Sequence, residues 1–385
     1  PTAIRYPVLM LLSKEDGGGG RPVALMCSPQ RVWEGVRSPL LDRWDRQNHR
    51  SYDFAGKGQA GHKAVWRSML DDEAFGSCGF CSATVLTDLA KAFEKVHLNL
   101  LWMLAVAFRM PLGVVMLALE NYLGIRYIKL DGAYSWGACT MQGLVAGSKF
   151  ANRFLKLVLL IPLDWTLGRW ARIQVIMYVD DVKLKMLGTL REVVKVIPEA
   201  TSMLLWWLEH VLQLEVSKDD AGKAGKSGFL GSCCEVVSQL LPAMADMGIH
   251  EEQSKKWLGI DYQPSADKPR QPTRMARLAK AVFNWAKVRQ QQRKRRKVGA
   301  VIRQGHCAAL AYGARCLGTP AAVLQYVQAK TKATQAGAGK FRSGRLGEAL
   351  HGNNEVVRLV LAPVQAWAEE AWDMKEQRKV QTKAW

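Results

Sequence analysis

Tyr178-Val179-Asp180-Asp181 lies between two apolar runs and places two carboxylates side by side. The run before it, Ile173 to Val179, is rich in β-branched residues, which favour a strand over a helix. A second apolar run, Val182 to Leu187, follows at once, so the sequence predicts a β-hairpin with Asp180 and Asp181 in its tight connection. Adjacent carboxylates repel each other and are the oxygen ligands that Mg²⁺ prefers, whereas the alternative is an acidic surface turn.

A third carboxylate follows an earlier apolar stretch. The segment Ala83 to Val96 begins as a strand that is expected to end at Asp88 and then becomes helix-like. In two-metal phosphoryl transfer, one ion activates the attacking hydroxyl and the other stabilises the leaving oxygens, so carboxylates from separate strands must bridge both ions. We therefore predict Asp88, Asp180 and Asp181 as catalytic residues that bind two Mg²⁺ ions, with Mn²⁺ as an alternative.

The order and spacing of these segments resemble the palm of a reverse transcriptase, most closely those of non-LTR, LINE-type retrotransposons. The Tyr-Val-Asp-Asp tetrad matches the signature of that family. Asp88 followed by Lys-Ala-Phe-Glu resembles its first palm motif, with Glu94 where Asp is usual. The resemblance implies that Tyr178 contacts the nucleotide and that Phe93 is a steric gate against a 2′-hydroxyl. A place in the core is the alternative for Phe93.

Two further segments resemble nucleotide-binding motifs of the family. The stretch Lys14 to Leu25 resembles the fingers hairpin, which implies that Lys14 and Arg21 face the triphosphate; an exposed basic hairpin is the alternative. The stretch Gly137 to Ser148 resembles the motif in which a Gln-Gly pair, here Gln142 and Gly143, contacts template and nucleotide. The family's Ser-Pro is replaced by Gly147-Ser148, and this departure bears on local geometry and activity.

The last two motifs follow the hairpin. Leu212 to Lys218 resembles the segment whose lysine protonates the pyrophosphate leaving group, so Lys218 is the candidate general acid, with Glu215 where Asn is usual. An ordinary solvated lysine is the alternative. Lys256 to Ile260 resembles the primer-grip turn, in which Trp257, Leu258 and Gly259 would contact the primer and the glycine would let the backbone approach it.

The charge of the chain indicates a polynucleotide partner. The formal net charge is +20 over 385 residues, and between Asp267 and Glu348 there are nineteen Lys and Arg and no acidic residue. Such a surface binds phosphate backbones with salt-dependent affinity. The cluster Arg293-Lys294-Arg295-Arg296-Lys297 is predicted to bind nucleic acid; a nuclear import signal and a solvated helix end are the alternatives. An anionic membrane is disfavoured because a large apolar face is missing.

The fold class that we predict is α+β: a right-hand polymerase with an RRM-like antiparallel palm sheet. Residues 1–75 would form partial fingers, 76–265 a palm backed by helices such as Leu98 to Phe108 and Ser202 to Leu214, and 266–385 a helical basic thumb or connection. Eight cysteines without a disulfide framework favour a reducing, intracellular compartment, and the import reading would add the nucleus. The start at Pro1 suggests a piece of a longer polyprotein or a truncated element copy.

The leading hypothesis is an RNA-directed DNA polymerase that extends a DNA primer on an RNA template with deoxynucleoside triphosphates. A decayed copy that binds nucleic acid without catalysis is the first alternative, favoured by Gly147-Ser148 and by the start of the chain. An RNA-dependent RNA polymerase shares the carboxylate plan, but Phe93 and Tyr178 argue against it. The sequence does not predict the oligomeric state.

Overall fold

The computed structural model describes the backbone of residues 8–13, 20–56, 58–130, 133–219, 225–264, 271–293, 305, 307–335 and 355–383. The chain divides into two compact units. Unit 1 comprises Pro1–Ala60 and Phe75–Glu252, and unit 2 comprises Gly61–Ala74 and Gln253–Trp385. The division into fingers (1–75), palm (76–265) and thumb (266–385) stays a prediction, because these units group the chain differently.

The central sheet of unit 1 has the strand order β10-β9-β3-β7-β6, with β8 paired to β3 outside this path. All its pairings are antiparallel except that of β9 with β10. The predicted hairpin is confirmed, because β6 and β7 are consecutive and paired. The strands are β3 (Cys81–Ala90), β6 (Ile173–Tyr178), β7 (Asp181–Gly188), β8 (Glu215–Val216), β9 (Gly228–Gly231) and β10 (His250–Glu251).

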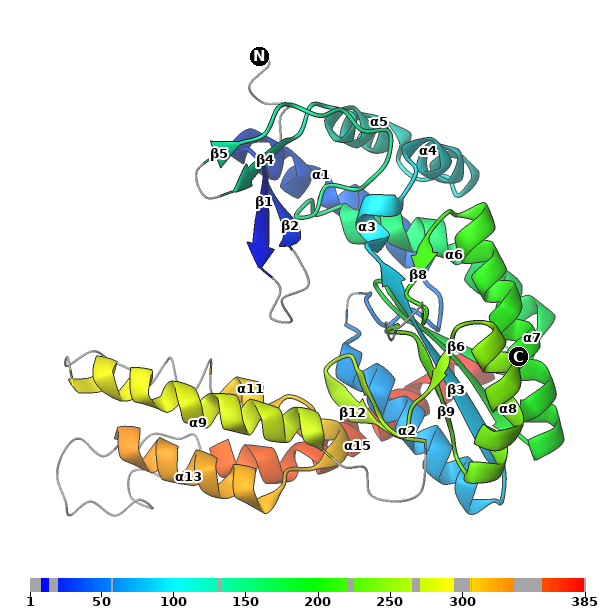
Figure 1. Cartoon of the computed structure of the whole chain (residues 1–385), viewed down its shortest axis with the longest axis vertical. Coiled ribbons are helices and arrows are strands. Elements are labelled where there is room, and N and C mark those ends of the chain that lie inside the picture. Colours follow the sequence, from blue (N-terminus) through cyan, green and yellow to red (C-terminus); the bar gives the residue numbers. More distant parts are fainter. Residues whose placement is uncertain are drawn as a thin grey trace. The chain divides into compact units, whose positions relative to one another are not determined.

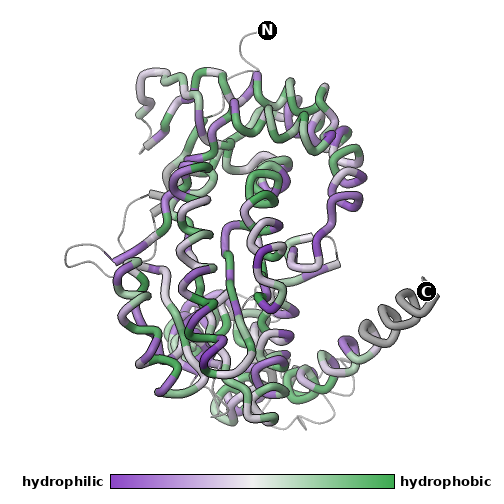
Figure 2. Tube along the Cα trace, turned by 90° about the vertical axis from the view of Figure 1, so that its right-hand side faces the viewer, coloured by the Kyte–Doolittle hydropathy of each residue, from purple (hydrophilic) through white to green (hydrophobic). Residues whose placement is uncertain are grey.

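Helices α6 (Ala151–Arg169), α7 (Leu190–Trp206) and α8 (Cys234–Asp246) cover one face of this sheet (Figure 1). Apolar residues recur with period two along the strands, so Val182, Leu184 and Met186 of β7 join the main hydrophobic core. Green and purple alternate along the helices in Figure 2, which is typical of helices that are buried on one side.

The helix predicted at Ser202 to Leu214 is displaced in the structure. Helix α7 begins at Leu190 and ends at Trp206, and a single π-helical turn, Trp207–Val211, follows. Its start is set by a capping box in which the Thr189 hydroxyl accepts from the Glu192 amide and the Glu192 carboxylate accepts from the Thr189 amide. Pro198 lies inside α7. The helix predicted at Leu98 to Phe108 is confirmed as α4 (Leu98–Ala107).

A second sheet of unit 1 has the order β2-β1-β4-β5. The fingers-like hairpin is present in its backbone, since β1 pairs antiparallel with β2, and β1 also pairs in parallel with β4. The remaining elements of unit 1 are β1 (Val8–Ser13), β2 (Gly20–Leu25), β4 (Tyr127–Leu130), β5 (Ala133–Tyr134), α1 (Ser28–Gln47), α3 (Ala92–Lys95) and α5 (Leu112–Tyr122).

Among its described residues, unit 2 is mostly helical. Its own core includes Val288, Leu310, Val323 and Leu359. The elements are β11 (Lys255–Trp257), β12 (Ile260–Tyr262), α9 (Pro272–Arg293), α11 (Ala308–Ala311), α12 (Ala314–Leu317), α13 (Ala321–Gln335), α15 (Glu355–Lys383) and residues 61–74 of α2 (Gly61–Ser77). In the part of the chain that the structure describes, no helix is long and apolar enough to cross a bilayer.

The capping box generates a stability prediction. Replacing Thr189 with Ala removes the side-chain acceptor for the Glu192 amide, which should lower the free energy of unfolding by about 1 kcal/mol. Denaturant titration followed by circular dichroism measures the change. Ser202→Ala, at an exposed interior position of the same helix, is the control and should be near neutral. Equal midpoints for the two variants would contradict the role of the cap.

Candidate active site

The turn between β6 and β7 carries the adjacent carboxylates. Tyr178 and Asp181 are paired across the hairpin, so Val179 and Asp180 alone make the connection. Val179 has φ +61°, a left-handed conformation that is strained for a β-branched residue. The turn is therefore held in place by its surroundings, and both carboxylates are half-buried.

Asp88 lies directly opposite Asp181 in the pairing of β3 with β7. The prediction that the strand ends at Asp88 is wrong, because β3 continues to Ala90 by pairing with β8. The Asp88 amide donates to the Ser227 hydroxyl (3.1 Å), and its carbonyl accepts from the Ser217 amide (2.9 Å). The backbone of Asp88 is thus fixed on both sides within the sheet.

The three carboxylates influence one another electrostatically. Burial, followed by the negative charges of Asp180 and Asp88, raises the pKa of Asp181 to about 7. A site that repels its own charges gains by binding a cation, and an all-carboxylate donor set suits Mg²⁺. Among the described residues, no three His, Cys, Asp or Glu side chains already converge closely enough to hold a metal. The three carboxylates therefore fit Mg²⁺ by the type of donor atom and by the strand pairing that sets Asp88 opposite Asp181.

The Gln142-Gly143 segment lies beside the turn of helix that contains Phe93. The Gly143 amide donates to the Val96 carbonyl (2.8 Å), and the Leu144 amide donates to the Phe93 carbonyl (2.6 Å). Gly143 has φ +92°, and a Cβ there would lie 3.0 Å from the Glu94 carbonyl oxygen. The structure therefore brings the two predicted nucleotide-binding motifs together. Phe93 itself is half-buried and packs against the main core, while Gln142 is exposed.

In the Gly147-Ser148 pair, Ser148 is buried and hydrogen-bonded on two sides. The Ser148 hydroxyl accepts from the Tyr122 hydroxyl (2.7 Å) and donates to the Glu34 carboxylate (2.8 Å), which also accepts from the Lys149 amide (2.8 Å). Burial raises the pKa of Glu34. Gly147, at φ +112°, lies so close to β2 that a Cβ would be 3.0 Å from the Ala24 carbonyl oxygen. Glycine at 147 allows the positive φ and the close approach to β2, and serine at 148 supplies the hydroxyl that bonds to Tyr122 and Glu34.

Lys218 lies next to the strand that carries Asp88, and it forms an ion pair with Glu209. Ser217, its neighbour, donates to the Asp88 carbonyl, as described above. The Lys218 ammonium lies 2.7 Å from the Glu209 carboxylate of the π-helical turn. Sequence reasoning missed Glu209, because a glutamate in a helical stretch gives no signal of its partner nine residues away.

The predicted primer-grip residues form a tight hairpin in unit 2. Trp257 pairs with Ile260, and Leu258 and Gly259, at φ +48° and +77°, make the turn between β11 and β12. Two side chains support this turn: Tyr312 donates to the Leu258 carbonyl (2.8 Å), and Arg277 donates to the Gly259 carbonyl (2.6 Å). Trp257 is buried.

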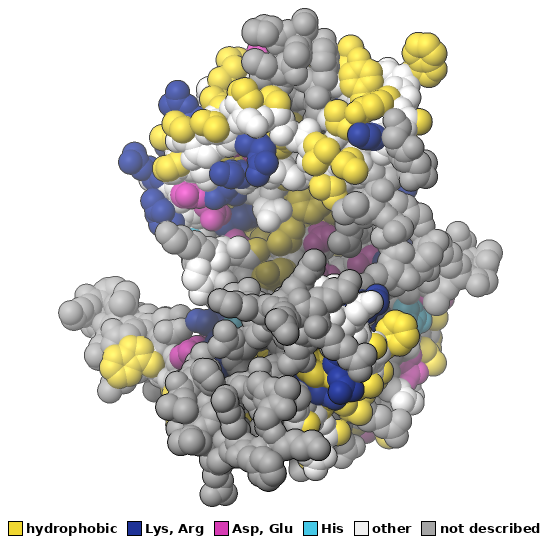
Figure 3. Space-filling view, turned by 90° about the vertical axis from the view of Figure 1, so that its left-hand side faces the viewer, with side chains coloured by type: hydrophobic (Ala, Val, Ile, Leu, Met, Phe, Trp, Pro, Cys, Tyr) yellow, Lys and Arg dark blue, Asp and Glu magenta, His cyan; other side chains and the backbone are white. Residues whose placement is uncertain are grey.

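Other predicted residues fall wholly or partly outside the described structure. Lys14 and Lys294, Arg295, Arg296 and Lys297 lie outside the described residues. Arg21 lies on β2 opposite Leu12, and Arg293 ends α9, but only their backbones are described. Figure 3 shows one face on which exposed Lys and Arg side chains lie beside apolar ones.

Comparisons with known proteins relate the chain to others by fold. The sequence matches no known protein-family profile and no curated protein. It is similar in structure to telomerase from Candida albicans in complex with a TWJ fragment of telomeric RNA, with a TM-score of 0.53 and 9% identity. That match covers 94% of this chain and 60% of the telomerase chain.

Telomerase from Candida tropicalis gives a comparable result. In complex with a TWJ fragment of telomeric RNA, its TM-score is 0.53 at 9% identity. The match covers 94% of this chain and 59% of the telomerase chain. In the apo form its TM-score is 0.50 at 9% identity, and the match covers 94% of this chain and 62% of the telomerase chain. The chain thus spans about three fifths of the length of these telomerases. The likeness shows a mixed α/β, right-hand-polymerase fold of the reverse-transcriptase kind.

The raised pKa of Asp181 generates a pH prediction for the metal-free protein. Between about pH 4 and 7 the folded state holds a proton that an unfolded Asp has released, so this group's contribution to stability falls as the pH rises through that window. Asp181→Asn should remove that fall. Urea unfolding of both proteins from pH 5 to 8 in chelator measures it, with the exposed Glu120→Gln as a control. Parallel curves for wild type and Asp181→Asn would contradict the prediction.

Proposed function

We propose that this chain is an RNA-directed DNA polymerase of a non-LTR retroelement, which extends a DNA primer on an RNA template. The observation that carries the proposal is the strand register that sets Asp88 opposite Asp181, next to the Val179-Asp180 turn, within a reverse-transcriptase-like fold. The reaction joins the primer 3′-oxygen to the α-phosphorus of a deoxynucleoside triphosphate, and pyrophosphate leaves.

Asp88, Asp180 and Asp181 would hold two Mg²⁺ ions, or Mn²⁺ in their place. Bound there, the ions would supply activation of the 3′-hydroxyl and neutralisation of charge on the leaving oxygens. Lys218 would donate a proton to the pyrophosphate, and its ion pair with Glu209 (2.7 Å) orients the ammonium.

The remaining predicted residues would bind substrates. The Phe93 ring would lie under the deoxyribose. The Gln142-Gly143 segment would lie beside it, because the Gly143 and Leu144 amides donate hydrogen bonds to the segment that contains Phe93. Lys14 and Arg21 would contact the triphosphate, Tyr178 the nucleotide, and Trp257, Leu258 and Gly259 the primer. Arg293 to Lys297 would contact backbone phosphates, in keeping with the excess of positive charge. An intracellular, nuclear location is part of the same proposal.

Primer extension tests the proposal. Asp180→Asn should lower nucleotide incorporation on an RNA template at least ~100-fold, because a ligand charge at the reacting phosphate is lost. Affinity for the template-primer duplex should change little, since basic side chains carry it. The exposed Glu120→Gln of α5 makes the same charge change away from the turn and should leave extension unchanged. Extension by Asp180→Asn at the wild-type rate would refute the metal site.

A second candidate is a protein that binds nucleic acid without catalysis. The absence of a converged three-carboxylate cluster among the described residues favours it. Lack of extension by wild type in either Mg²⁺ or Mn²⁺, with salt-sensitive duplex binding retained, would support this candidate over the polymerase.

The steric gate gives a separate prediction. Phe93→Val removes the ring that would block a 2′-hydroxyl, so discrimination against ribonucleotides should fall by about 10-fold or more. The ratio of kcat/KM for deoxyribo- and ribonucleotides measures it. Because Phe93 also packs on the core, Phe93→Leu is included as a milder change. An unchanged ratio in both variants would place Phe93 in the core alone.

A further inference from the structure

Residues Arg50–Gly56, which we call the strap, run alongside β6, the last strand in the order of the sheet. The Phe54 amide donates to the Met177 carbonyl (2.9 Å), and the Met177 amide donates to the Tyr52 carbonyl (2.8 Å). These two bonds make a parallel bridge between Asp53 and Met177. Met177 precedes the strained Val179 by two residues, so the strap is joined to the strand that leads into the carboxylate turn.

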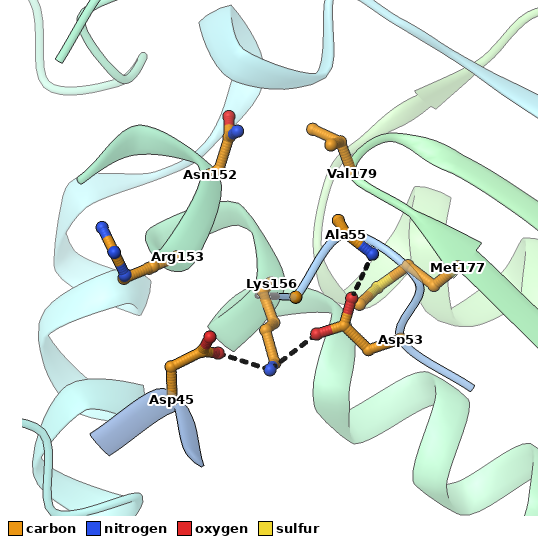
Figure 4. A pocket seen from close by; sticks show the side chains of 9 residues that line it. Asp45, Asp53, Ala55, Asn152, Arg153, Lys156, Met177 and Val179 are labelled. Atoms are coloured by element: carbon orange, nitrogen blue, oxygen red, sulfur yellow. Dashed lines mark hydrogen bonds and ion pairs between the residues drawn. The ribbon is translucent and has the colours of Figure 1, made fainter. Parts of the chain in front are cut away.

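A lysine of α6 forms an ion pair with the strap. The Lys156 ammonium lies 2.7 Å from the Asp53 carboxylate and 2.5 Å from that of Asp45 on α1 (Figure 4). The side chains of Lys156 and Asp53 are only 8% and 2% exposed. The second Asp53 oxygen accepts from the Ala55 amide (2.9 Å), which closes the strap's own turn. One buried cation thus ties together α1, α6 and the strap.

The strap has a second, weaker attachment to α6. Asp164, eight residues after Lys156, accepts from the Arg50 guanidinium (2.9 Å) and from the Tyr52 hydroxyl (2.7 Å). This ion pair is about one third exposed, whereas the Lys156 pair is buried. Removing one partner of a buried pair leaves an uncompensated charge, so Lys156 is the more consequential contact.

The turn packs on the main core through the half-buried Val179, and it also borders a cavity on the side of the strap. Asp53, Lys156, Met177 and Val179 line this cavity, and Figure 4 shows the Val179 side chain beside it, close to the strap residue Ala55. Core packing holds the Val179 side chain, and the two backbone bonds through Met177 hold the strand that leads into the turn.

We propose that Lys156 is a positioning residue for the polymerase reaction: by holding Asp53 it keeps the strap on β6 and so fixes the turn that carries Asp180 and Asp181. This inference rests on the proposed function. The Lys156 ammonium pairs with Asp53 and Asp45, so its effect on the reaction passes through Asp53, the Met177 backbone and the turn.

Kinetics test the positioning role. Lys156→Met should lower kcat for nucleotide incorporation by about 10- to 100-fold, because small displacements of reacting groups cost that much. The KM for nucleotide and the Kd for duplex should stay within about twofold, because binding surfaces are untouched. Lys156→Arg, which keeps the charge, should recover most of kcat. Arg172→Gln breaks an exposed ion pair with Glu192 next to the opposite end of β6 and should behave as wild type.

Hydrogen exchange tests the strap without relying on activity. Exchange of the Phe54 and Met177 amides should be at least tenfold faster in Lys156→Met than in wild type, and unchanged in Arg172→Gln. Asp53→Asn, which keeps size and shape, serves if Lys156→Met does not fold. Unchanged exchange, or unchanged kcat beside an active wild type, would overturn the inference. An inactive wild type would instead refute the proposed polymerase, while the exchange result would still decide whether Lys156 holds the strap.

Discussion

The antiparallel register of β3 with β7 is the constraint on which the candidate site depends. It sets Asp88 opposite Asp181, and because side chains alternate along a strand, a slip of one residue would turn one of them into the apolar core. Val182, Leu184 and Met186 fill that core from the intervening positions. The same burial that fixes the register also removes water from Asp181, and its pKa rises in consequence. The electrostatics of the site thus follow from the packing of the sheet.

Main-chain hydrogen bonds assemble the surroundings of the turn from distant parts of the chain. Tyr52 and Phe54 bond to β6, Ser217 bonds to Asp88, and Leu144 bonds to Phe93. Backbone partners define the path of each segment closely while leaving side chains available for other contacts. At Gly147-Ser148 the path is set by a close approach to Ala24 and by side-chain hydrogen bonds to Glu34 and Tyr122, which the serine hydroxyl makes.

Local patterns were sufficient to predict the hairpin, because two short β-branched runs flank a polar connection. They failed where pairing with a distant strand decides the outcome: β3 runs past Asp88 because Leu89 and Ala90 find partners in β8. They also failed to reveal Lys156, Asp53 and Glu209, whose partners are set only by folding. A lysine in an apolar helix and an aspartate between two aromatic residues are ordinary in sequence. The roles of the predicted site residues stay predictions.

The two charge clusters around the turn differ in how they are balanced. Asp53 and Asp45 share the Lys156 ammonium within 2.7 Å, so that cluster is largely compensated inside the protein. Burial and the negative charges of Asp180 and Asp88 raise the pKa of Asp181. Removing a carboxylate from water beside two charges of the same sign disfavours its charged form, and a bound cation would relieve that cost. The first cluster can therefore hold the backbone in place, whereas the second is the one that would gain from an external cation.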